Sequence, residues 1–133
     1  VNYSLIDGKY TQGLSSFEGK QLEYVIPHLL RAGLIIRCQK WHASYQFNYQ
    51  DLQYTDANNS IRVSDATRGI VPSFSINDYS MGYEMKHFQV KFSVNNIFNK
   101  AYFTRRALSY PGPGIIVGQP RNLYIKLSYI FGS

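Results

Sequence analysis

The fold is decided by the last part of the chain, from Val90 to Phe131, whose final run reads Asn122-Leu123-Tyr124-Ile125-Lys126-Leu127-Ser128-Tyr129-Ile130-Phe131. Successive side chains of a β-strand point to opposite faces, so this run has one apolar and one polar face. The apolar face would consist of Leu123, Ile125, Leu127, Tyr129 and Phe131. A face this regular needs an apolar neighbour, which is either a protein core or lipid.

The same alternation recurs upstream, while helical periodicity is almost absent. It predicts further strands at about 1 to 10, 28 to 38, 41 to 50, 73 to 85 and 88 to 95. The clearest of them places Trp41, Ala43, Tyr45, Phe47 and Tyr49 on one face. The sequence therefore predicts an all-β fold, an antiparallel up-and-down meander of about six strands.

The connections between these strands alternate between long and short. Long ones are expected at 11 to 27, 51 to 72 and 98 to 120, and short ones at 39 to 40 and 86 to 87. Every second connection of a meander lies at the same end, so the long loops should leave one end and the tight turns the other. The 51 to 72 connection is polar enough to be surface. Short turns at one rim and long loops at the other are typical of outer-membrane barrels.

The polar face of the expected sheet is rich in basic and amide side chains, and the opposite face carries no charge. Its members are Arg31, Arg37, His42, Gln46, Asn48, Gln89, Lys91, Asn95, Lys126 and Ser128. A soluble sandwich would alternate in the same way, with this face in water. The pattern therefore fits a transmembrane β-barrel, and also a soluble all-β binding module, for example one that binds carbohydrate in a tyrosine-lined groove.

Composition argues against several other classes of protein. The chain has a formal net charge of +6, but its fourteen Lys and Arg are spread singly except for Arg105-Arg106, so no nucleic-acid interface is expected. No run of about eighteen apolar residues could form a transmembrane helix. The single cysteine and three dispersed histidines predict no metal site and no cofactor. The carboxylates form no close pair for acid–base chemistry, so we expect no enzyme.

Several segments of the chain carry a combined signal when they are taken in order. The strongest are Val94-Asn95-Asn96-Ile97-Phe98-Asn99-Lys100-Ala101-Tyr102-Phe103, then Tyr110-Pro111-Gly112-Pro113-Gly114, then Pro120-Arg121-Asn122-Leu123-Tyr124 before an aromatic last strand. Upstream of them are Tyr24-Val25-Ile26-Pro27-His28, Tyr54-Thr55-Asp56-Ala57 and Gly69-Ile70-Val71-Pro72. These segments resemble the matching positions of TonB-dependent outer-membrane receptors, nearest the ferric-citrate and siderophore receptor subgroup. The resemblance therefore spans nearly the whole chain.

This resemblance implies that residues 1–133 are the C-terminal portion of a receptor barrel in the bacterial cell outer membrane. The family's barrel has about twenty-two strands, and its plug domain and earlier strands would lie outside this sequence. Six strands alone would leave two unpaired edges. One departure is that Gly132 and Ser133 follow Phe131, whereas the family usually ends on an aromatic residue.

The function implied by the resemblance is uptake of a ferric chelate of siderophore or ferric-citrate type. The expected partners are the chelate, outer-membrane lipid, and TonB acting through the missing plug. Loop cations and aromatics are the candidate ligand-binding residues, because guanidinium groups match carboxylates. They are Arg105, Arg106, Tyr102, Tyr110, Tyr54 and Arg68, with Arg62 in the same loop as Arg68. Alternatively, the arginines contact outer-leaflet phosphates or only solubilise the loops.

Overall fold

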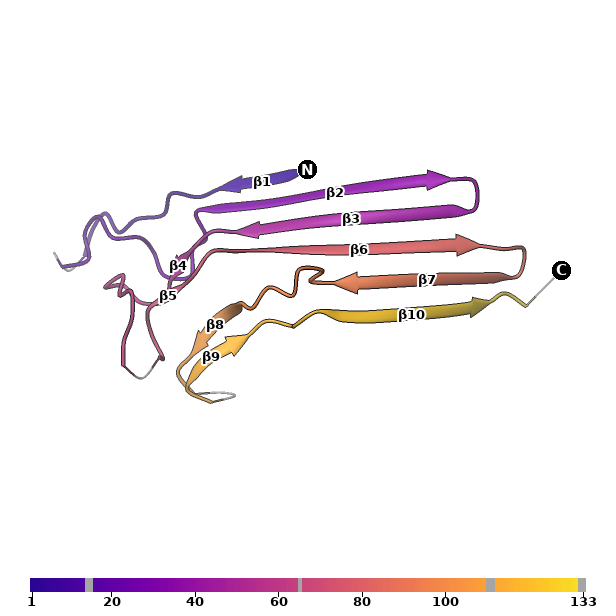
Figure 1. The fold of residues 1–133 in the computed structure, drawn as a ribbon. Coiled ribbons are helices and arrows are strands. Elements are labelled where there is room, and N and C mark those ends of the chain that lie inside the picture. Colours follow the sequence, from indigo (N-terminus) through magenta and orange to yellow (C-terminus); the bar gives the residue numbers. More distant parts are fainter. Residues whose placement is uncertain (14–15, 65, 110–111, 132–133) are drawn as a thin grey trace.

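The computed structural model describes residues 1–13, 16–64, 66–109 and 112–131. These residues form one antiparallel sheet of six strands in the order β1-β2-β3-β6-β7-β10, with two small two-stranded sheets beyond one end (Figure 1). The six strands are Asn2–Leu5, His28–Cys38, Trp41–Gln50, Phe74–Glu84, Phe88–Asn95 and Asn122–Tyr129. No helix among the described residues is long and apolar enough to cross a membrane. The predicted all-β meander is confirmed.

Long and short connections lie at opposite ends of this sheet, as the sequence predicts (Figure 1). The β6–β7 turn is closed by backbone hydrogen bonds in which Met85 N donates to Phe88 O and Phe88 N donates to Met85 O, and Glu84 N donates to Lys40 O, which joins the end of β6 to the β2–β3 turn. Gln39, in the first of these turns, has a φ of 52°. The three long segments leave the sheet at its other end, which we call the loop end.

The cross-strand register confirms the two predicted faces. Arg37 lies opposite His42, and Lys91 lies opposite Lys126, on the polar face. On the other face Trp41 lies opposite Tyr83, and Phe92 lies opposite Ile125. Because paired residues of neighbouring strands share a face, the alternation of each strand adds up to one polar and one apolar surface.

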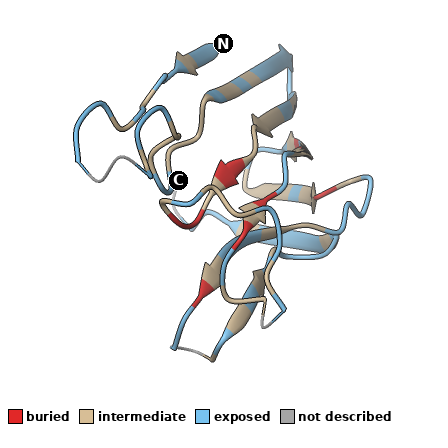
Figure 2. Cartoon of the chain, turned by 90° about the vertical axis from the view of Figure 1, so that its left-hand side faces the viewer, coloured by how far each residue is buried: buried red, intermediate tan, exposed pale blue. Residues whose placement is uncertain are grey.

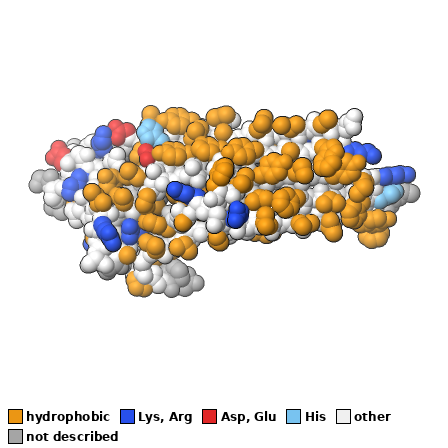
Figure 3. All heavy atoms as spheres, in the orientation of Figure 1, with side chains coloured by type: hydrophobic (Ala, Val, Ile, Leu, Met, Phe, Trp, Pro, Cys, Tyr) orange, Lys and Arg blue, Asp and Glu red, His pale blue; other side chains and the backbone are white. Residues whose placement is uncertain are grey.

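The apolar face of the sheet is uncovered. Leu34, Leu127 and Ile125 are 58%, 62% and 72% exposed, and Figure 3 shows the broad apolar band that such side chains form across the strands. Val71 and Ala107 are the only described hydrophobic residues that are buried, and both lie beyond the loop end of the sheet. The described residues therefore place no protein core beneath this face.

Two strand ends differ from the prediction by more than one residue. The first strand was expected to reach residue 10, but β1 ends at Leu5, where Ile6 N donates to Pro27 O and the chain leaves the sheet. The last strand was expected to include Phe131, but β10 ends at Tyr129, and Ile130 N bonds to His87 O. In both places the ladder stops at the first residue of the partner strand, His28 of β2 and Phe88 of β7.

The long connections contain further structure that the sequence did not predict. In the second, β4 (Gln53–Tyr54) pairs with β5 (Ile70–Val71), and in the third, β8 (Phe103–Ala107) pairs with β9 (Gly114–Val117). In Figure 2, where buried residues are red, much of the red lies in these long connections. The expectation that 51 to 72 is simply polar surface is therefore wrong, since Gln53, Thr55 and Val71 are buried. Gln53 pairs with Val71 and Thr55 bonds to Gly69 within the same segment, and β5 also contacts β8 of the third segment.

Candidate functional site in the loop cluster

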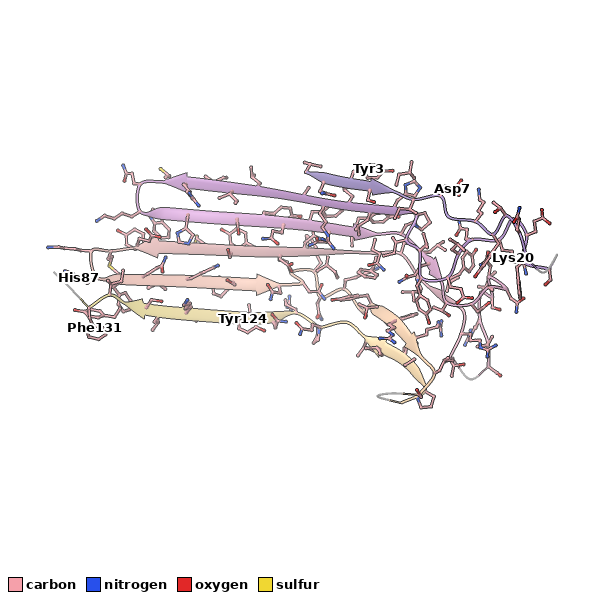
Figure 4. All side chains as sticks on the ribbon, turned by 180° about the vertical axis from the view of Figure 1, so that it is seen from behind. Tyr3, Asp7, Lys20, His87, Tyr124 and Phe131 are labelled. Atoms are coloured by element: carbon pink, nitrogen blue, oxygen red, sulfur yellow. The ribbon has the colours of Figure 1, made fainter. Side chains whose placement is uncertain are left out.

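The three long segments, 6–27, 51–73 and 96–121, form what we call the loop cluster, and the first two are joined by hydrogen bonds. Asn59 accepts a bond from Gln21 N at 2.8 Å and donates from Nδ2 to Gln21 O at 2.9 Å. Tyr24 N donates to Tyr54 O at 2.8 Å. Figure 4 labels Lys20 in this cluster, at the opposite end of the molecule from His87 and Phe131.

The two arms of the second segment are held together by Thr55. Its hydroxyl donates to Gly69 O at 2.8 Å and accepts from Gly69 N at 3.1 Å. Gly69 has a φ of +117°, and a Cβ there would lie 2.7 Å from Ile61 O. Both the backbone conformation and the close approach therefore require glycine at this position. The loop can fold back tightly because residue 69 has no side chain.

Arg106 joins the third segment to the second. Its Nε donates to Ile70 O at 3.0 Å and its Nη1 donates to Ala66 O at 2.7 Å. Its guanidinium also lies 5.1 Å from the centroid of the Phe103 ring, a cation–π contact. Arg106 is therefore a link between two loops, and part of its hydrogen-bonding capacity is already used.

A hollow of about 410 Å³ lies where these two loops meet. Most of its wall is apolar, from Ile61, Ile70, Pro72, Phe103 and Ile115, and its cations are Arg62 and Arg106. An apolar pocket with a few charged groups suits a ligand that has an apolar body and an anionic substituent. The hollow is the best candidate for a ligand site in the loop cluster.

The structure separates the residues that the sequence grouped as ligand-binding candidates. Arg106 lines the hollow, as does Arg62, whereas Arg68 and Arg105 are exposed and do not. Tyr54 is half-buried in β4 and does not line it either. Tyr102 contacts Phe74 with ring centroids 4.6 Å apart and ring planes tilted by 37°, and a side chain at Gly118 would collide with the Tyr102 ring. Tyr110 lies outside the described residues.

The apolar residues of the hollow could not be found from the sequence. Ile61 and Ile70 come from the second segment and Ile115 from the third, and they belong to no alternating pattern; the hollow lies where Arg106 joins these two segments. Arg62 and Phe103 stand out in the sequence only as a cation and an aromatic in a loop. The sequence does mark this region by the consecutive arginines Arg105 and Arg106. In the structure Arg106 lines the hollow and Arg105 remains exposed.

Little else in the loop cluster suggests chemistry. Partial desolvation and the neighbouring Glu23 carboxylate raise the pKa of the Tyr10 phenol above its usual range. Among the described residues no three His, Cys, Asp or Glu side chains lie close enough together to hold a metal ion. The side chains that line the hollow offer cations, an aromatic ring and apolar contact for recognition of a ligand.

Comparison with known proteins relates this fold to that of iron-chelate receptors. No family model matches the sequence. The ferric citrate transporter FecA in its unliganded form matches with a TM-score of 0.77 and 26% identity over 87% of this chain and 18% of FecA. The siderophore receptor PiuA from Acinetobacter baumannii matches at 0.71 and 20% identity, covering 86% of this chain and 15% of PiuA.

A further match is BauA, the ferric preacinetobactin receptor from Acinetobacter baumannii, with a TM-score of 0.68 and 21% identity over 96% of this chain and 18% of BauA. The chain therefore spans less than a fifth of each of these three proteins. All three are receptors or transporters rather than enzymes. The antiparallel sheet and its long loops have the fold of a segment of ferric citrate and siderophore receptors.

Proposed function

We propose that the chain is the C-terminal portion of the transmembrane barrel of a TonB-dependent receptor in the bacterial outer membrane. The whole receptor would take up a ferric chelate of the citrate or siderophore type. The observation that carries this proposal is the likeness to FecA, which extends over 87% of the chain at a TM-score of 0.77. The ligand class, the location in the membrane and the dependence on TonB are proposed for the whole receptor to which the chain would belong.

The dimensions of the sheet support a transmembrane position. β2 and β6 each have eleven residues, which rise about 36 Å along the strand and, tilted by about 40°, cross about 28 Å. That distance is close to the thickness of the hydrocarbon layer, about 30 Å. The exposed apolar face would then contact lipid. Aromatic pairs near the tight turns, Trp41–Tyr83 and Tyr129–Phe131, would lie at the membrane boundary.

A soluble binding module is the other function compatible with the alternating sequence, and no structural observation favours it. Such a module would have to cover the apolar face of the sheet with a second layer. The described residues contribute no second layer, and most of the side chains on this face are exposed or half-buried. Lipid is the environment that makes an uncovered face of this kind stable.

The proposed receptor would bind its chelate from outside, at the loop end. The hollow between the second and third loops supplies Arg62 and Arg106 for an anionic group and Phe103 for an apolar or aromatic one. Arg105 is exposed on the same hairpin and would add to the positive field that attracts the chelate. Energy for passage would come from TonB, acting on the plug domain that the family carries elsewhere in its chain.

The proposal is tested with the full-length product expressed in a Gram-negative host. We expect it in the outer-membrane fraction, resistant to extraction with high salt or carbonate and released by detergent. In detergent it should bind ferric citrate or a ferric siderophore, measured by quenching of intrinsic fluorescence, and iron-starved cells carrying it should take up the bound chelate. A product that is soluble without detergent, or that binds no ferric chelate of either type, would contradict the proposal.

A further inference from the structure

Basic residues form one straight row across the polar face of the sheet. Arg37 of β2 lies opposite His42 of β3, and His42 lies opposite Gly82 of β6. Gly82 in turn lies opposite Lys91 of β7, and Lys91 lies opposite Lys126 of β10. Because neighbouring strands are about 4.8 Å apart, this cationic row spans about 19 Å. It lies towards the tight turns, the end where Figure 4 labels His87.

The row is electrostatically unfavourable by itself. Lys91 and Lys126 are like charges directly opposite each other, an arrangement that destabilises an antiparallel pair. Among the described residues no ion pair neutralises Arg37, Lys91 or Lys126. The nearest carboxylate, Glu84, lies 3.8 Å from His42 Nδ1 and accepts a hydrogen bond from Gln89. When a local arrangement lowers the stability of the sheet and no contact compensates for it, a functional role is expected.

Gly82 gives the row a recess. A side chain at this position would collide with the His42 ring, which lies over the glycine backbone. The ring therefore lies low in the middle of the row, and a hollow of about 510 Å³ opens above it. Arg37, His42 and Lys91 line this hollow together with Lys40 of the adjacent tight turn, Glu84 and Gln89, whereas Lys126 lies outside its lining, opposite Lys91. Its size suits a small molecule, and its charged groups converge from four neighbouring strands.

Other cations of the polar face are not arranged in this way. Arg31, nearer the loop end, lies opposite Asn2 of β1 and Asn48 of β3, so no charged side chain faces it on either neighbouring strand. The acidic residue in that half of the sheet, Asp78, accepts a hydrogen bond from Asn96 N. The accumulation of positive charge is therefore confined to one level of the sheet.

We propose that the cationic row is a second anion site, distinct from the loop cluster, at which the anionic ferric chelate docks on its way through the receptor. The ligand class is a small anion with several carboxylate or similar oxygens. Rings of Arg and Lys select anions in membrane pores, and on a closed barrel this row would be part of such a ring. The assignment to a transport path rests on the proposed function. In such a receptor the long loops would face the outside of the cell and the tight turns the inner side of the outer membrane.

Occupation of the row is tested first with simple anions. The probes are inorganic phosphate and citrate, added to the detergent-solubilised full-length protein during reductive methylation of lysines, with each lysine followed by mass spectrometry. We expect both probes to slow modification of Lys91 and Lys126, with citrate effective at lower concentration. Lys86, which belongs neither to the cationic row nor to the lining of the hollow, is the control and should be modified at the same rate throughout. Equal rates with and without anions would overturn the proposal.

Transport is tested with the double variant K91Q/K126Q. We expect the affinity of the receptor for the chelate to change by less than about twofold and the rate of uptake to fall about tenfold. K91R/K126R, which keeps both charges, should restore uptake, and R31Q, a single cation on the same face, should leave it unchanged. Unchanged uptake in K91Q/K126Q would overturn the transit role.

The two proposals fail in different ways. If the wild-type receptor binds no ferric chelate, the proposed function fails, but protection of Lys91 and Lys126 by phosphate still decides whether the row binds anions. If the chelate binds and is taken up while neither lysine responds to any anion, only the second site fails. Protection of both lysines in the absence of added anion would mean that another part of the longer chain covers the row, which also overturns the proposal.

Discussion

The carboxylate of Asp78, within β6, accepts a hydrogen bond of 2.8 Å from the backbone N–H of Asn96, the first residue after β7. Asn96 is 3% exposed and has a φ of 51°, a conformation that asparagine adopts more readily than most residues. Its side chain bonds to both backbone groups of Lys100, at 2.9 and 2.8 Å, and to Gln119 O at 3.1 Å. One residue therefore holds both legs of the third loop against the sheet.

Replacing this residue should open the base of the third loop. Asn96→Ala removes three side-chain hydrogen bonds, and at about 1 kcal/mol for each this should lower the free energy of local opening by about 2 to 4 kcal/mol. We expect faster hydrogen exchange and faster proteolysis between residues 97 and 118 in the full-length protein. Asn58→Ala, at an exposed asparagine of the second loop, is the control. Equal proteolysis of both variants would show that the Asn96 side chain does not hold the loop.

Gly82 and His42 should be energetically coupled. Gly82→Ala forces the His42 ring away from the strand, and overpacking of this kind costs about 1 to 3 kcal/mol. The double variant G82A/H42A should recover most of that loss, measured as the denaturant midpoint in detergent. Gly33→Ala is a matched control on the same face, because its nearest contact would be an ordinary 3.8 Å to Tyr45 O. A G82A variant as stable as G33A would mean that the ring moves freely.

The sheet could be predicted from sequence because each of its strands carries its own pattern. β2, β3 and β7 have the predicted bounds, since alternation of side chains and the Gln39-Lys40 turn are properties of short segments. The face of each residue follows from the same alternation, so the two faces were predicted correctly. The strand ends at Leu5 and Tyr129 were not, because they depend on where a neighbouring strand stops pairing.

The candidate site was less predictable, because it depends on contacts between loops. Nothing near Arg106 in the sequence indicates that its partners are the carbonyls of Ala66 and Ile70, 40 and 36 residues earlier. The cationic row was equally hard to predict from the sequence. Arg37, Lys91 and Lys126 are each unremarkable on their own strand, and only the cross-strand register brings them into line.

Gly69 should tolerate no side chain. Gly69→Ala combines an unfavourable positive φ with a contact of 2.7 Å to Ile61 O, so the second loop would have to open. We expect a loss of about 2 kcal/mol or more in local stability, read as increased hydrogen exchange at residues 61–70. Gly112→Ala is the control, because a Cβ there meets nothing within 4 Å. Unchanged exchange in Gly69→Ala would show that the arms of the loop are not held together.

The two consecutive arginines should behave differently when replaced. Arg106→Ala removes the link between the second and third loops, together with the contact to Phe103, which we expect to cost about 1 to 2 kcal/mol because the guanidinium is half-exposed. Proteolysis of both loops should accelerate. Arg106→Lys should not restore the wild-type rate, because the Lys ammonium cannot reproduce the geometry in which the planar guanidinium donates to Ile70 O and Ala66 O.

Arg105→Ala should leave proteolysis unchanged, because Arg105 is exposed and its side chain makes no hydrogen bond or ion pair among the described residues. If the receptor binds an anionic chelate, this variant should slow association by removing a positive charge near the hollow, and the effect should shrink at high salt. Chelate association rates of R105A and R106A, measured at low and high salt, separate attraction by charge from loss of loop structure. A salt-independent loss of affinity in R105A would instead mean that Arg105 contacts the chelate directly.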